Sequence, residues 1–121
     1  MIVLHLPWPP SINEANRFGK RGYYPSTAKQ KFIADAHGLY LTQKRALGGL
    51  RVEGPFTYHL VLNRAHRGPL TDGDNRIKYP LDCAQTFGLI ENDKFAEAGS
   101  WSWGECLHGC MLSIHPNKAG M

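Results

Sequence analysis

The chain has 121 residues, of which 42% are hydrophobic and 20% are charged, a composition typical of one globular domain with a buried core. Its net charge of +4 and isoelectric point near 9.1 favour a polyanionic partner such as DNA. No apolar run approaches the ~18–20 residues of a membrane span, and the N-terminal segment has neither a basic leader nor a long apolar core. We therefore expect a cytoplasmic protein with no membrane partner.

The first 25 residues predict a short strand followed by a long loop. Residues 2–6 are apolar, and the prolines that follow them end the strand. Residues 11–25 show no hydrophobic periodicity, so we expect a mobile loop in which basic and aromatic residues alternate. This pattern suits contact with DNA phosphates and bases, although a loop pinned by core aromatics is an equal alternative. The residues expected to contact DNA there are Arg17, Phe18, Lys20 and Arg21.

A long amphipathic helix is predicted from Ser26 or Thr27 to about Leu47. Its apolar residues recur every three or four positions and therefore share one face. They are Phe32, Ile33, Ala36, Leu39, Tyr40 and Leu47. The two glycines that follow, Gly48 and Gly49, end the helix.

The second half of the chain predicts a strand, a helix and two more strands. Residues 56–65 alternate apolar and polar side chains as a half-buried strand does. Two further strands are expected, one at about 95–103 and the last at 106–116, with a turn at Gly104 and Glu105 between them. His59, on the first of these strands, is expected to be packed or hydrogen-bonded rather than catalytic. A helix is expected from Asn75 to Phe87 with Gly88 as its cap, although Pro80 requires that it begin later or be kinked.

The predicted element order is β-α-β-α-β-β, which belongs to the α+β fold class. We expect a single domain, 1–121, with two helices packed on a four-stranded mixed or antiparallel sheet. The tail at 117–121 is expected to be frayed.

The residues that suggest chemistry gather between Thr71 and Asp93. Asp72 and Asp74 are two positions apart, so an extended backbone turns both carboxylates to the same side. Two carboxylates held together repel each other unless a cation lies between them, and an all-oxygen set suits Mg2+, or Mn2+. The alternative is a polar turn in which Asp74 caps the following helix, because Asp, Gly and Asn are common turn residues.

The three cysteines, Cys83, Cys106 and Cys110, are an odd number, which argues against a disulfide framework. Cys106, His108, Cys110 and His115 are residue types that bind zinc. Alternate residues on a strand are ~6.6 Å apart and cannot close around one ion, so zinc is disfavoured.

Two separated motifs are similar to those of one family. The first is LPWPPSIN, at 6–13, which is similar to an LPxPPSxN opening. The second is D-x-D-N-x-x-K, formed by Asp72, Asp74, Asn75 and Lys78. It is followed by Asp82, Gly88 and Asp93. Over nearly its whole length the chain thereby resembles the RusA-like Holliday junction resolvases, endodeoxyribonucleases common in bacterial prophages.

The resemblance implies a Mg2+-dependent homodimer that cuts four-way DNA junctions symmetrically. It implies that three carboxylates are catalytic and hold the ion, namely Asp72, Asp74 and Asp93, and that Lys78 is the essential lysine. Secondary candidates for the site are Asp82, Glu91 and Asn75. DNA contact near the acidic pair is expected from Arg64, Arg67 and Arg76.

The chain departs from the family pattern at two places. Pro69, Leu70 and Thr71 stand where members often carry arginines, and Asn92 replaces an acidic residue beside Asp93. Two other functions stay open: a nucleic-acid-binding module that does not cut, and a nuclease of the same fold that acts on other branched DNA. Without the resemblance, the residues indicate a basic α+β domain with a candidate Mg2+ site.

Overall fold

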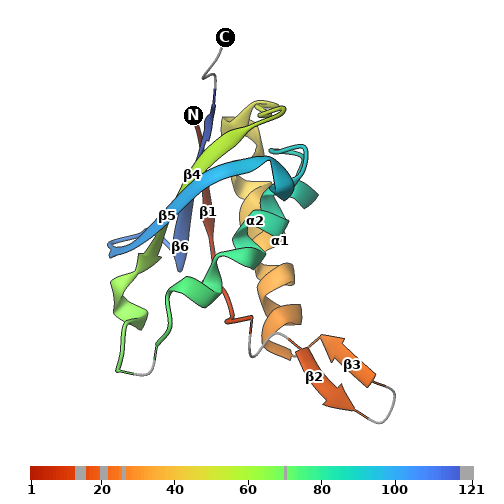
Figure 1. Ribbon diagram of the computed structural model, residues 1–121, viewed down its shortest axis with the longest axis vertical. Helices are drawn as coiled ribbons and strands as arrows, with labels where there is room; N and C mark the ends of the chain where they lie inside the picture. Colours follow the sequence, from red (N-terminus) through yellow and green to blue (C-terminus); the bar gives the residue numbers. More distant parts are fainter. Residues whose placement is uncertain (13–15, 20–21, 26, 70, 118–121) are drawn as a thin grey trace.

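The computed structural model describes residues 1–12, 16–19, 22–25, 27–69 and 71–117. Within these residues the chain forms a four-stranded sheet, two α-helices on one face of that sheet, and a separate two-stranded hairpin (Figure 1). This is the α+β domain expected from the sequence, with the hairpin as an addition. None of the helices in the described ranges has the length and apolar character needed to cross a bilayer.

The sheet has the strand order β1-β6-β4-β5, in which β6 is antiparallel to both of its neighbours and β5 runs parallel to β4. The bounds are Ile2–Leu6 for β1, Phe56–Asn63 for β4, Ala96–Gly104 for β5 and Cys110–Pro116 for β6. Parallel neighbours need a crossover connection, and the chain between β4 and β5 contains helix α2, Lys78–Thr86. The sheet is therefore mixed, one of the two alternatives that the sequence left open.

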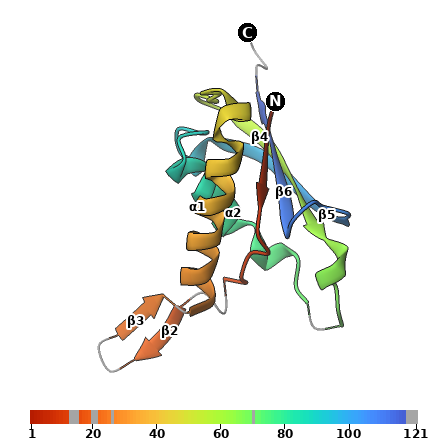
Figure 2. The same ribbon diagram turned by 180° about the vertical axis from the view of Figure 1, so that it is seen from behind.

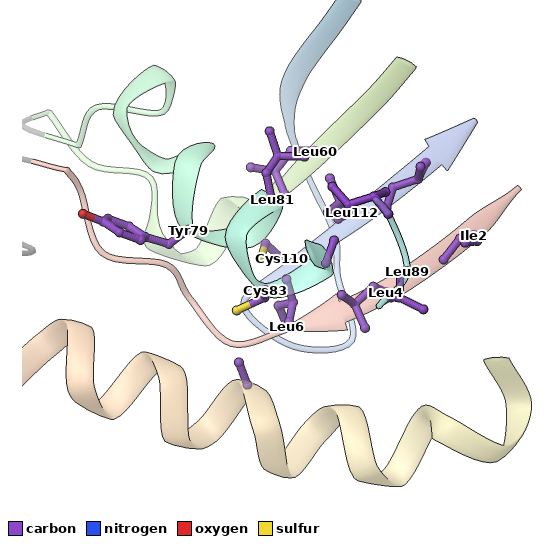
Figure 3. Close-up of a cluster of buried hydrophobic side chains, with 14 of the residues drawn as sticks. Ile2, Leu4, Leu6, Leu60, Tyr79, Leu81, Cys83, Leu89, Cys110 and Leu112 are labelled. Carbon is purple, nitrogen blue, oxygen red and sulfur yellow. The ribbon is translucent and has the colours of Figure 1, made fainter. Parts of the chain in front are cut away.

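One face of the sheet supplies the hydrophobic core. The strand register places Leu4, Leu112 and Leu60 side by side across β1, β6 and β4, and all three are fully buried. Figure 3 shows them with buried side chains of α2 in the layer between the sheet and the long helix. Burying a leucine completely contributes roughly 1.5–3 kcal/mol, so this apolar layer is what holds the helices on the sheet.

The long helix α1 spans Thr27–Leu47, close to the predicted bounds, and packs against the edge strand β1. Phe32 and Ala36 are buried in the core. Ile33 is 51% exposed, so its assignment to the buried face was wrong, because only a narrow stripe of the helix meets the sheet. The helix is followed by Gly48, whose φ of +59° is the left-handed conformation typical of a C-terminal cap.

One side chain of α1 covers the outer edge of β1. The backbone N–H of His5 donates to Gln43 Oε1 at 2.8 Å, and Gln43 Nε2 donates to the carbonyl oxygen of His5 at 2.8 Å. An edge strand otherwise presents unpaired backbone groups that invite pairing with another chain. Gln43 therefore satisfies two of the backbone groups that a further strand would have paired.

Helix α2 begins at Lys78, after a short 3₁₀ turn at Asp74–Arg76 (η2), so of the two alternatives, a start later than Asn75 or a kink, the later start is observed. This start accommodates Pro80. As the third helical residue it lies in the first turn, where a backbone N–H has no partner within the helix and a proline costs little. Gly88 follows the helix with a φ of +78°, as its predicted role as a cap requires.

Strands β4 and β6 are both shorter than the sequence predicted. Asn63 ends β4, because its side chain accepts from the N–H of Ala65 at 3.0 Å and caps the 3₁₀ turn Arg64–His66 (η1). The same amide donates to the carbonyl oxygen of His108 at 2.8 Å. Residues 106–109 are thereby held in a loop, and β6 begins only at Cys110.

The segment at 11–25 contains a hairpin, which corrects the prediction of a long loop. β2 (Asn16–Gly19) pairs antiparallel with β3 (Gly22–Pro25), and the hairpin projects away from the sheet beyond the first turn of α1 (Figure 1, Figure 2). Two residues separate the strands in the sequence, which is the commonest hairpin spacing. Strands of four residues are too short to show a hydrophobic period, so the pattern was missed.

On the sheet face opposite the helices, His59 is held by two serines of β5. Its Nδ1 lies 2.6 Å from Ser100 Oγ and its Nε2 lies 2.9 Å from Ser102 Oγ. Both ring nitrogens are therefore hydrogen-bonded, as expected for a histidine at this position of the strand.

The substitution Gln43→Ala should lower the free energy of unfolding by about 1–2 kcal/mol, because it removes two hydrogen bonds to half-buried backbone groups. Urea denaturation followed by circular dichroism measures the difference. The neighbouring exposed Lys44→Ala is the matched control and should change stability by less than about 0.5 kcal/mol. Equal stability of the two variants would show that the contact with β1 contributes nothing.

Candidate functional site

Residues 71–78, which we call the acidic segment, lie against β5. Gly73 lies directly against the indole of Trp101, because a Cβ placed on Gly73 would be 2.4 Å from Cζ3 of that ring. A glycine is therefore required between the two aspartates for a steric reason. The backbone N–H of Ile12 donates to the carbonyl oxygen of Asn75 at 2.9 Å, so the N-terminal segment lies alongside as well.

The carboxylate of Asp72 is bonded on both of its oxygens. Oδ2 accepts from Asn75 Nδ2 at 2.7 Å and from Ser11 Oγ at 3.2 Å, and Oδ1 lies 3.3 Å from Arg76 Nη2. The hydrogen bond from Asn75 is the largest influence that lowers the pKa of Asp72; the bond from Ser11 and the charge of Arg76 act in the same direction. These contacts bring the LPWPPSIN motif and the D-x-D-N-x-x-K motif together in space.

Arg76 does not occupy the solvent-facing position expected for a DNA contact. It is 8% exposed, and its Nη1 donates to the carbonyl oxygen of Pro9 at 2.7 Å while its Nε donates to that of Asp72 at 3.0 Å. Its guanidinium carbon also lies 4.7 Å from the ring centre of Trp8. A buried guanidinium that is bonded on several sides joins segments of the protein, so we leave Arg76 out of the DNA surface.

Asp74 and Lys78 are both exposed, at the start of η2 and of α2. Lys78 Nζ lies 3.8 Å from Asp82 Oδ1, one helical turn further on. Burial raises the pKa of the Asp82 carboxyl, the charge of Lys78 opposes that rise, and the carboxylate of Asp93 adds to it. Asp82 and Asp93 are thus electrostatic neighbours, with Lys78 as a nearby cation.

Asp93 is half-buried at the start of a 3₁₀ turn, Asp93–Phe95 (η3). Its N–H donates to Gln85 Oε1 of α2 at 3.1 Å, and the side chain of Asn92 caps the turn by accepting from the N–H of Lys94 at 3.0 Å. An amide serves this capping role as well as a carboxylate does, so the departure at Asn92 leaves the turn intact. Glu91 is directed elsewhere, because its carboxylate accepts from the N–H of Gly54 at 3.3 Å.

The carboxylates expected to hold an ion do not form a ready-made three-ligand cage. Within the part of the chain that the structure describes, no three His, Cys, Asp or Glu side chains are grouped so that they could hold a metal ion. Mg2+, however, commonly keeps several waters and takes only one or two carboxylates, with substrate phosphates completing its shell. The exposed carboxylate of Asp74 and the half-buried one of Asp93 have the oxygen chemistry for that simpler mode.

The cysteines are unsuited to nucleophilic chemistry. Cys83, Cys106 and Cys110 are free thiols, and burial raises the pKa of Cys83 to about 12 and that of Cys110 well above its usual range. The thiolate is the reactive form, so these groups stay protonated and unreactive at neutral pH.

Two of the residues expected to contact DNA lie in the hairpin. Arg17 and Phe18 belong to β2, whereas Lys20 and Arg21 lie outside the described residues. Arg64 and Arg67 are exposed next to η1, and the guanidinium carbon of Arg67 lies 5.9 Å from the ring centre of Trp103. The structure thus places both arginines on the surface, and Arg67 beside an aromatic group.

Sequence reasoning missed the residues that assemble the site. Ser11 and Trp8 lie within the LPWPPSIN motif, but nothing in that motif indicates that they contact Asp72 and Arg76. The available signal was a polar serine directly after two prolines, since a polar side chain in a stiff, buried segment requires a partner.

Neither a protein-family model nor a curated protein matches the chain.

The substitution Asp72→Asn should lower the free energy of unfolding by about 1–2 kcal/mol at pH 7, because it weakens the pairing with the buried Arg76. The folded-state pKa of Asp72 is lowered, so its stabilising effect is full above the unfolded-state pKa and is lost as pH falls through the folded-state pKa. The difference from wild type should therefore shrink below about pH 4, since a protonated carboxyl is as neutral as the amide. Urea denaturation at several pH values measures this.

Asp74→Asn is the matched control for that measurement, because Asp74 is exposed on the same short segment. Its stability should stay within about 0.5 kcal/mol of wild type at every pH. A difference for Asp72→Asn that is independent of pH would contradict the charged pairing with Arg76.

Proposed function

We propose that this chain is an endonuclease that cuts branched DNA, with four-way junctions as its substrate, and that it acts as a Mg2+-dependent homodimer in the cytoplasm. The observation that carries the proposal is the contact between the two motif segments. Pro9 and Ser11 are bonded to the acidic segment through Arg76 and Asp72, while Asp74 and Lys78 on that segment remain exposed. A pattern that serves only as a turn needs no such support.

The exposed groups suit the cleavage of a phosphodiester. Lys78 is a compact positive charge that can approach a phosphate oxygen, and the exposed Asp74 carboxylate is open to solvent. When bound, a divalent ion supplies charge neutralisation at the phosphate and lowers the pKa of a coordinated water. Asp82 Oδ1 lies 3.8 Å from Lys78 Nζ and would hold that ammonium at the exposed start of α2.

A homodimer fits the symmetry of the proposed substrate. A four-way junction has two strands related by two-fold symmetry, and a dimer presents two equal sites to them. Each subunit would then cut one of the two symmetry-related strands, so paired cuts would follow from the symmetry of the dimer.

A second candidate function is a DNA-binding module that does not cut. It is favoured by the engagement of both Asp72 oxygens within the protein, which leaves that carboxylate poorly placed to serve an ion. A module of this kind would gain nothing from an exposed carboxylate facing phosphate, because like charges repel. The behaviour of Asp74 therefore separates the two functions.

Cleavage of a synthetic four-way junction, with a linear duplex of the same sequence as comparison, tests the proposal. Wild type with Mg2+ should give paired symmetric nicks on the junction, and EDTA should abolish them. Asp74→Asn and Lys78→Ala should each slow cleavage by about 100-fold or more while binding is kept. Glu105→Gln, an exposed acid outside the acidic segment, is the control and should cut like wild type.

Asp74→Asn is a cleaner test than Asp72→Asn, because the latter also disturbs the buried Arg76. Binding without cutting in Mg2+ and in Mn2+ would establish the non-cutting module. Wild-type rates for Asp74→Asn and Lys78→Ala would show that cleavage, if present, uses other residues.

A further inference from the structure

Three aromatic side chains form a stack beside the acidic segment. The rings of Trp8 and His66 are 4.3 Å apart and 10° from parallel, and Trp8 and Trp103 are 6.1 Å apart and 19° from parallel. Trp101 meets the edge of Trp103 at 5.9 Å. We call Trp8, His66, Trp101 and Trp103 the aromatic cluster. His66 is exposed and Trp8 and Trp103 are half-buried, so the stack ends at the surface.

Positive charge surrounds the aromatic cluster. Arg67 lies over Trp103, and Arg64 is exposed on the same short turn as His66. On the adjoining acidic segment, the carboxylate of Asp72 is paired with the buried Arg76. A stack of aromatic faces next to two exposed arginines is complementary to a nucleotide, which has a flat base and an anionic phosphate.

The aromatic cluster is joined to the acidic segment at two points. Thr71 Oγ1 donates to the carbonyl oxygen of His66 at 3.1 Å, and Gly73 packs directly on Trp101. A nucleotide held by the cluster would therefore lie within the neighbourhood of Asp74. The stack is placed to position DNA relative to the acidic segment.

We propose that the exposed end of the aromatic cluster binds a nucleobase that has lost its stacking neighbour, so that the substrate is recognised by open bases at its branch point. In a continuous duplex each base is covered on both faces by its neighbours, and an aromatic surface has nothing to stack on. At a branch point, or in a single strand, base faces are open and stack on aromatic side chains regardless of sequence. This inference rests on the proposed function for its biological setting.

Intrinsic fluorescence tests the inference at the site itself, because the three tryptophans of the chain all belong to the aromatic cluster. Titration with single-stranded oligothymidylate should quench the emission saturably. A relaxed circular duplex, which has neither ends nor unpaired bases, should quench it at least tenfold more weakly at the same nucleotide and salt concentrations, and the salt is held fixed because phosphate contacts depend on it.

His66→Ala should weaken the binding of oligothymidylate about tenfold, the loss expected from removing one stacking partner. His66→Tyr keeps an aromatic face and should bind like wild type, which separates stacking from a merely structural role of the histidine. His108→Ala, another exposed histidine, is the control and should bind unchanged. Urea midpoints of all variants show whether each one folds.

Wild-type affinity of His66→Ala, or equal quenching by the single strand and the duplex, would overturn the inference. Its failure is distinct from failure of the proposed function. Stacking without junction cleavage would support the aromatic site and contradict the proposed nuclease function. Junction cleavage by His66→Ala with wild-type selectivity would support the nuclease function and contradict the aromatic site.

Discussion

The buried guanidinium of Arg76 is the constraint on which the arrangement of the site depends. A charge that is only 8% exposed must be paired and hydrogen-bonded, or the fold loses several kcal/mol. Its partners are the carboxylate of Asp72 and the carbonyl oxygens of Pro9 and Asp72, with Trp8 beside it. One side chain therefore fixes the N-terminal segment, the acidic segment and the indole of Trp8 relative to one another.

This arrangement divides the acidic pair into two different roles. Asp72 is committed to the protein on both oxygens, whereas Asp74 is two residues away and exposed. The separation follows from the backbone at Gly73, which bends against Trp101 before the short turn that leads to α2. Asp72 therefore stabilises the structure, whereas Asp74 remains accessible to solvent. Lys78, the first residue of α2, is exposed as well.

The layers of the fold could be predicted from the sequence, whereas the assembly of the site could not. Two local signals were sufficient for this. The alternation of apolar residues at Phe56, Leu60 and Leu62 predicted a strand of the sheet, and the glycines after each helix predicted the helix ends. The residues next to Arg76 in the sequence do not distinguish it from an exposed arginine. Its burial depends on a contact with Pro9, which is distant in the sequence. The β2-β3 hairpin and the aromatic cluster likewise depend on pairings between short or separate segments that leave no period to detect.

A double-mutant cycle on Asp72 and Arg76 tests most directly whether this pairing organises the site. Free energies of unfolding would be measured for wild type, Asp72→Asn, Arg76→Met and the double variant. Contact between the two charges predicts a coupling energy of about 1–3 kcal/mol, with the double variant less destabilised than the sum of the single ones. Losses that add to within about 0.3–0.5 kcal/mol would contradict the claim, because additivity is the behaviour of residues that do not interact.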